Sequence, residues 1–206
     1  LLDRIPDREW RRRRLLILAY HSVAVDDEHL WRRPLFFTAG ELEDRLRLLK
    51  RCHVDVLPLA DGLDRLHSGT LPRRSAVLTF DDGTADFARV VWPMLKRYGF
   101  PATVYATTYY SEKRQPIVPL MCSYLLWKGR NRTLGPAPDI GLAERVDLSD
   151  AAARSKAERS IVAAALGAGD STESGARAAR LAELLGIDYG LLLERRVLQL
   201  MTAEGI

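Results

Sequence analysis

Cysteine is scarce in this sequence, which contains only Cys52 and Cys122 among its 206 residues. No CxxC pair occurs, so a structural zinc ribbon is excluded. One disulfide bond and two buried thiols are both compatible with two cysteines about seventy positions apart. The cysteines therefore leave the redox compartment undecided.

Long apolar runs are also missing. No stretch approaches the roughly 20 residues of a membrane span, and LLILAY at 15–20 is too short for a signal-peptide core. The formal net charge is only +4, and part of the excess lies in the arginine run 11–14. A solvated turn explains this run, and attraction to an anionic envelope surface is the alternative. We expect no nucleic-acid partner, because no recognition motif follows the arginines.

Strand and helix patterns alternate in the first half of the chain. This alternation predicts an α/β fold, either a parallel sheet or a (β/α) barrel. The expected strands, apolar on both faces and therefore buried, are 15–23, 54–59, 76–80 and 102–108, and the expected helices are 38–52, 60–69 and 86–99.

Two local signals sharpen this prediction. Thr38 and Glu41 have the spacing of a capping box at a helix start. Pro93 lies inside the third expected helix, where we expect it to cause a kink.

The alternation stops after residue 108. Turn signals fill 109–150 with few regular runs, and the Ala- and Ser-rich stretch 151–179 suggests loose order within an otherwise helical pattern. We therefore expect a barrel part at 1–108, a mainly helical insertion or subdomain at 109–200, and the start of a return into the barrel at 201–206. A lid, a membrane-docking surface and an oligomer contact are equally open as roles for the insertion.

An acidic pair follows the third expected strand in the stretch AVLTFDDGTADF, residues 76–87. Side chains at the carboxyl ends of parallel strands face the functional cleft, so Asp81 and Asp82 are candidate site residues. Gly83 directly after them allows a tight turn or a close ligand approach. The alternative is an acidic turn that caps the next helix, with Asp86 as a further cap candidate.

The segments LILAYHSV, LTFDDG and WPMLKRYGFPATVY, in this order within residues 15–107, resemble the polysaccharide deacetylase (NodB-homology) family, the fourth family of carbohydrate esterases. The resemblance implies a bacterial hydrolase with a distorted, TIM-like (β/α) barrel, incomplete in this chain and carrying the helical insertion. It implies metal-dependent removal of N-acetyl groups from a carbohydrate, an attack on carbon–nitrogen but not peptide bonds. By position in the motif, Asp81 is the implied general base and Asp82 the implied metal ligand, with zinc the usual metal and two histidines as its other ligands.

The implied chemistry is coherent. A divalent cation polarises the amide carbonyl and lowers the pKa of bound water. A neighbouring carboxylate accepts the proton of that water, and a backbone N–H stabilises the oxyanion.

The sequence departs from the family pattern at the metal ligands. The usual HxxxH pair is absent, and the four histidines, His21, His29, His53 and His67, all precede the acidic pair. We therefore expect the chain to end before its metal ligands and to show little turnover alone. His21, at the end of the first strand, is expected to line the cleft with its ring hydrogen-bonded near the acidic pair. Direct metal ligation or substrate contact is the alternative.

The expected partner is an N-acetylated carbohydrate polymer or oligomer, which the sequence does not identify further. Gly83 and Tyr105 are expected to line the cleft with His21. Four aromatic residues either stack on sugar rings or pack in the core and loops: Tyr105, Tyr109, Tyr110 and Trp127. Surface association with the envelope is a further expectation, and the compartment stays open between bacterial cytoplasm and envelope. A non-catalytic carbohydrate-binding or scaffold module of the same fold is the alternative function.

Overall fold

The computed structural model describes residues 13–113 and 115–202, and these divide into two compact units. We call residues 13–107 the sheet unit and residues 108–202 the helical unit. The division follows Thr107, whereas the sequence predicts it after residue 108. The start of the arginine run at 11–14 and most of the expected return at 201–206 lie outside the described residues.

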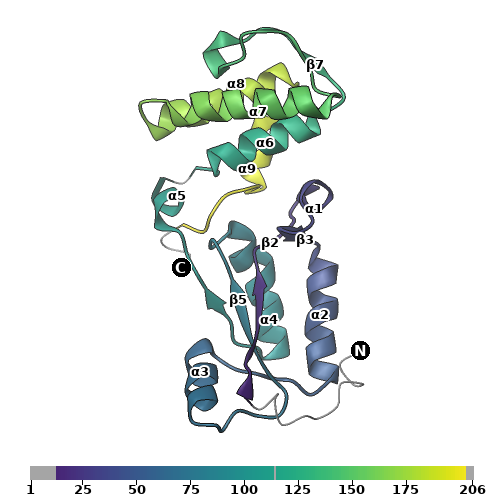
Figure 1. Cartoon of the computed structure of the whole chain (residues 1–206), viewed down its shortest axis with the longest axis vertical. Coiled ribbons are helices and arrows are strands. Elements are labelled where there is room, and N and C mark those ends of the chain that lie inside the picture. The colour runs from purple at the N-terminus through teal and green to yellow at the C-terminus, as the bar shows by residue number, and fades with distance from the viewer. Residues whose placement is uncertain (1–12, 114, 203–206) are drawn as a thin grey trace. The chain divides into compact units, whose positions relative to one another are not determined.

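The sheet unit is an α/β structure built on one parallel sheet. Strand β5 lies between β1 on one side and β4 and β6 on the other, and all three pairings are parallel. The elements of the unit are β1 (Leu16–Tyr20), β2 (Ser22–Val23), α1 (Glu28–Trp31), β3 (Phe36–Phe37), α2 (Ala39–Arg51), β4 (Asp55–Val56), α3 (Leu59–His67), β5 (Ser75–Phe80), the π-helical turn η3 (Phe87–Val91), α4 (Trp92–Tyr98) and β6 (Thr103–Val104) (Figure 1). The sheet is small and open within these described residues, with β2 and β3 forming a separate parallel pair.

Strand β5 is buried as predicted, but β1 is not. Leu16 and Ile17 are 46% and 48% exposed, so the prediction of a buried first strand is wrong. The predicted strand 15–23 is also broken at His21 into β1 and β2. The physical reason is position, because β1 is an edge strand that pairs only with β5 among the described residues. Apolar composition alone does not reveal which strand lies at an edge.

Helix α2 confirms its predicted start. The Glu41 amide donates to the Thr38 hydroxyl over 3.2 Å, and the Glu41 carboxylate accepts from the Thr38 amide over 2.7 Å. This reciprocal pair satisfies two amides at the helix start that have no partner within the helix. Leu42, Leu46 and Leu49 form the buried face of the helix.

Pro93 distorts the third predicted helix as expected, and the distortion is a π-helical turn. Proline has no N–H to donate to the carbonyl of Arg89, four residues earlier, and its ring clashes with that carbonyl. The preceding turn η3 widens, and the Trp92 amide donates to the Phe87 carbonyl, five residues back. Regular helix α4 then continues from Trp92.

The helical unit contains a buried helix that the sequence does not predict. Helix α6 lies within the region 109–150 that the turn signals assign to few regular runs. It contacts both α7 and α8 (Figure 1). The elements are α5 (Thr108–Lys113), α6 (Val118–Lys128), β7 (Thr133–Leu134), the 3₁₀ turn η4 (Pro138–Ile140), β8 (Val146–Asp147), α7 (Ala151–Leu166), α8 (Ser171–Leu184) and α9 (Tyr189–Glu194). The α6 side chains are apolar on nearly every face, so the helix shows no amphipathic period.

The Ala- and Ser-rich stretch 151–179 forms α7 and the first part of α8, joined by a turn at 167–170, which corrects the expectation of loose order. Asp150 caps α7 by accepting from the Ala152 amide over 2.8 Å, and Asp170 caps α8 by accepting from the Glu173 amide over 2.8 Å. Small side chains serve as core residues in this unit, since Ala157 is buried on α7. Cys52 and Cys122 are both buried free thiols, which settles the alternative left open by the sequence.

We expect Gly141→Ala to lower the free energy of unfolding by about 2–4 kcal/mol. Gly141 has φ 81°, and an added Cβ would lie 2.7 Å from the Ala164 Cβ and 2.9 Å from the Ser160 carbonyl oxygen. Urea unfolding measures the effect. Gly135→Ala is the matched control because its Cβ meets nothing within 4 Å. Equal stability of the two variants would contradict the packing of η4 against α7.

Candidate active site

Asp81 lies at the carboxyl end of β5, where the parallel ladders continue past the strand. Its amide donates to the Tyr20 carbonyl over 2.9 Å, and the Tyr105 amide donates to the Phe80 carbonyl over 2.9 Å. His21, Asp81 and Tyr105 therefore follow directly on the ends of three neighbouring strands, β1, β5 and β6. The structure thus brings these three candidate residues to one edge of the sheet.

The chain turns sharply at Asp82 and Gly83. Both residues have left-handed backbones, with φ 68° and φ 69°. The Gly83 amide donates to the Asp81 carbonyl over 2.9 Å, and the Thr107 amide donates to the Asp82 carbonyl over 3.3 Å. A left-handed backbone costs a non-glycine residue about 1–2 kcal/mol, although aspartate tolerates it better than most. Such strain is frequent at functional sites, so the left-handed backbone is consistent with Asp82 as a candidate site residue.

His21 contacts Asp82. The Nδ1 atom of His21 lies 3.4 Å from the Oδ2 atom of Asp82, and both side chains are partly exposed. This distance exceeds a normal N–H···O hydrogen bond, and Nδ1 has no hydrogen-bond partner among the described residues. The ring therefore lies beside the acidic pair as expected, without the expected hydrogen bond.

The residues at this edge do not complete a metal site. Zinc in catalytic sites takes three protein ligands, usually from His, Asp, Glu and Cys. Asp82 and His21 offer two donors of the right type. Within residues 13–113 and 115–202, no group of three or more such side chains could hold a metal ion. The donor set therefore does not fit a complete zinc centre.

Asp86 is a buried carboxyl that the sequence offers only as an alternative helix-cap candidate. It makes no side-chain cap bond to η3 and instead accepts from the Val23 amide over 2.7 Å. Burial raises the pKa of Asp86 to about 6, and the neighbouring charge of Glu28, itself buried with a raised pKa, adds to the increase. Asp86 thus ties β2 to the chain just after the acidic pair. The only sequence signal was a third acid in DDGTAD.

We expect Asp86→Asn to stabilise the protein at pH 7.5 by about 2–3 kcal/mol and to change little at pH 4. The pKa of this group is raised by folding, so its stabilising contribution is complete below about pH 4 and is lost as pH rises through about 6. Asparagine keeps the acceptor for Val23 and carries no charge. Urea unfolding at both pH values tests this, with the exposed Asp44→Asn as control. An equal effect at both pH values would contradict the assignment.

The sequence matches a known family over part of its length. Residues 68–124 match the family model for polysaccharide deacetylase. The matched segment includes β5, the acidic turn, α4 and β6. None of the curated proteins matches the sequence significantly.

Several solved structures are similar to parts of the chain. The Streptococcus pyogenes deacetylase PplD, solved with acetate, is 29% identical over 46% of this chain and 42% of its own, with a TM-score of 0.43. A de-N-acetylase from Aggregatibacter actinomycetemcomitans is 28% identical over 60% of this chain and 43% of its own, with a TM-score of 0.40. A polysaccharide deacetylase from Bacillus cereus is 21% identical over 45% and 29%, with a TM-score of 0.38. The chain spans less than half the length of each.

The family match and the sequence motifs agree on the same segment. Both include the acidic pair at the end of β5 and the helix that follows it. The LILAYHSV segment lies before the matched residues and rests on the motif resemblance alone. Residues 68–124 therefore match the polysaccharide deacetylase family, the family that the motifs of the sequence resemble.

Proposed function

We propose that the protein containing this chain is a metal-dependent hydrolase that removes N-acetyl groups from a carbohydrate built of N-acetylhexosamines. The observation that carries the proposal is the Asp81–Asp82 pair at the carboxyl end of β5, inside the family-matched segment. We further propose that the parallel sheet is part of a distorted (β/α) barrel. The partly exposed edge strand β1 supports this, because barrel closure would give it a second neighbour.

Asp81 is the proposed general base. Its backbone is held by the bond to Tyr20 and by the turn at Gly83, so the side chain starts from a fixed Cα position. In the proposed step, Asp81 accepts a proton from water as the water oxygen bonds to the acetyl carbonyl carbon. The carbon–nitrogen bond then breaks, the nitrogen takes up the proton that Asp81 accepted, and the products are the free amine and acetic acid, which ionises to acetate.

Asp82 is the proposed ligand of a divalent cation, most simply zinc. The two further ligands would be histidines of the protein outside this chain, because all four histidines of the chain are described and no complete donor set is found among the described residues. We accordingly propose that this chain alone binds zinc weakly and turns over little or no substrate.

The alternative function is a non-catalytic carbohydrate-binding or scaffold module. The incomplete donor set at Asp82 and His21 favours it. Association with an envelope surface is a further proposal. None of the helices within the described residues has the length and apolar character needed to cross a membrane.

An assay of acetate and free amine tests the proposal. The protein containing this chain is loaded with zinc and incubated with oligomers of N-acetylglucosamine, with N-acetylgalactosamine oligomers and with peptidoglycan fragments. We expect equal amounts of acetate and amine from at least one of them, loss of both after chelation, and recovery on adding zinc. Binding of these sugars without any acetate release would favour the non-catalytic alternative.

A further inference from the structure

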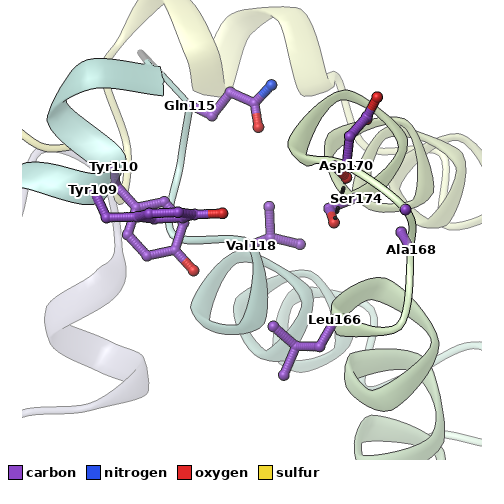
Figure 2. Close-up of a pocket in the computed structure, with 9 residues that line it drawn as sticks. Tyr109, Tyr110, Gln115, Val118, Leu166, Ala168, Asp170 and Ser174 are labelled. Carbon is purple, nitrogen blue, oxygen red and sulfur yellow. Dashed lines mark hydrogen bonds between the residues drawn. The ribbon is translucent and has the colours of Figure 1, made fainter.

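The helical unit contains a pocket that the proposed reaction does not use. Its volume is about 160 Å³, and it opens between α5, the start of α6 and the loop joining α7 to α8. Figure 2 shows Tyr109 and Tyr110 on one side, Gln115 above, Leu166 below and Asp170 opposite. A pocket for a drug-sized molecule measures about 300–1,000 Å³, so this one suits a single ring and not an extended chain.

The pocket presents aromatic and apolar surface to solvent. Tyr109 is 57% exposed and packs edge-to-face against Tyr110, with ring centroids 5.0 Å apart. Leu166 is 62% exposed, whereas Val118 behind it is buried. Leaving such large side chains partly in water forgoes burial energy, and exposed apolar clusters in pockets often mark binding sites.

Gln115 adds a polar group that offers both donors and an acceptor. The side-chain amide of Gln115 makes no hydrogen bond within the part of the chain that the structure describes, and in Figure 2 this side chain extends over the pocket. One carboxylate oxygen of Asp170, Oδ1, accepts from the Glu173 amide. Gln115 therefore adds an amide to the tyrosine hydroxyl groups of the lining, and both kinds of group can pair with the hydroxyl groups of a ligand.

These features select the chemistry of the ligand. The described lining holds one carboxylate and no cationic side chain, which disfavours phosphate and carboxylate ligands. An aromatic face carries partial negative charge and attracts the weakly positive C–H groups of a sugar ring. The side-chain amide of Gln115 can donate to and accept from the hydroxyl groups of a neutral sugar ring. We propose that this pocket binds one pyranose ring of an N-acetylhexosamine; the choice of an N-acetylated sugar rests on the proposed function.

Amide chemical shifts of the 206-residue chain test this proposal. The probes are N-acetylglucosamine, N-acetylgalactosamine and N-acetylmannosamine, each titrated to about 50 mM because a single ring binds with a Kd on the order of millimolar. We expect saturable shifts at Gln115, its side-chain amide and Gly169. Tyr109→Ala should weaken binding about three- to tenfold. Tyr109→Phe should retain it, since the ring remains.

Trp92→Ala is the matched control, because Trp92 is an exposed aromatic of the sheet unit, and we expect unchanged binding. Absence of saturable shifts with all three sugars, or unchanged binding in Tyr109→Ala, would overturn the pocket assignment. Acetate release reports separately on Asp81. Sugar binding without acetate release would support the sugar-binding pocket and contradict the proposed deacetylase function. Acetate release without these shifts would support the proposed function and contradict the sugar-binding pocket.

Discussion

Replacing Asp81 by asparagine should lower acetate release by the protein containing this chain by about 10²–10⁴-fold, while bound zinc stays stoichiometric. Asparagine has nearly the same shape as aspartate but does not accept a proton from water. The Asp81 backbone bond to Tyr20 involves only main-chain atoms, so the substitution leaves it in place. The measurements are acetate release under saturating substrate and zinc content by elemental analysis.

Asp61→Asn is the control for this result, because Asp61 is exposed on α3. This substitution removes the same charge at a position away from the acidic pair. We expect wild-type activity from it. If Asp81→Asn retained activity within a few-fold of wild type, Asp81 would not be the general base. If it lost zinc together with activity, Asp81 would instead be a ligand.

Replacing Asp82 should remove the metal, and the backbone at Asp82 decides which variant is cleanest. Because Asp82 has φ 68°, alanine would add about 1–2 kcal/mol of strain as it removes the carboxylate. Glycine adopts this conformation freely, so Asp82→Gly removes the carboxylate with stability within about 1 kcal/mol of wild type. We expect both variants to lose zinc affinity by at least about 100-fold and to lose detectable turnover.

The two variants separate a metal-binding role from a structural one. Zinc loss in Asp82→Gly, with unfolding close to wild type, assigns the carboxylate to the metal. Zinc retained stoichiometrically in either variant would exclude Asp82 as a ligand. If both variants kept zinc affinity and only Asp82→Ala lost stability, the role of Asp82 would be confined to forming the turn.

Local signals account for the parts of the fold that sequence reasoning predicts. The capping box at Thr38 is complete within four residues, and its structure follows. Strand β5 is apolar at four of its six positions, which predicts the burial that the structure shows at five of them. Pro93 distorts its helix because it has no N–H to donate, and the preceding turn becomes π-helical.

Tertiary environment explains what sequence reasoning misses. Helix α6 is hidden by its uniform apolarity, because a helix surrounded on all sides has no polar face to reveal the period. Strand β1 is exposed by its place at the sheet edge, which no composition encodes. Strands β4 and β6 each pair over only two residues of the longer predicted runs.

The candidate site divides in the same way. The approach of His21 and Tyr105 to Asp81 follows from strand ends alone, since parallel strands end at a common edge. The left-handed turn at Asp82 and the burial of Asp86 depend on contacts with residues distant in sequence, such as Thr107 and Val23. A pattern of side chains does not report such contacts.

Anomalous diffraction at the zinc edge, from crystals of the protein containing this chain, tests the central claim most directly. The claim is that the acidic turn after β5 is half of a deacetylase metal site. We predict an anomalous peak about 2.0–2.2 Å from a carboxylate oxygen of Asp82, with Asp81 near the metal but not bonded to it. Zinc bound elsewhere, with Asp82 free of it, would contradict the account.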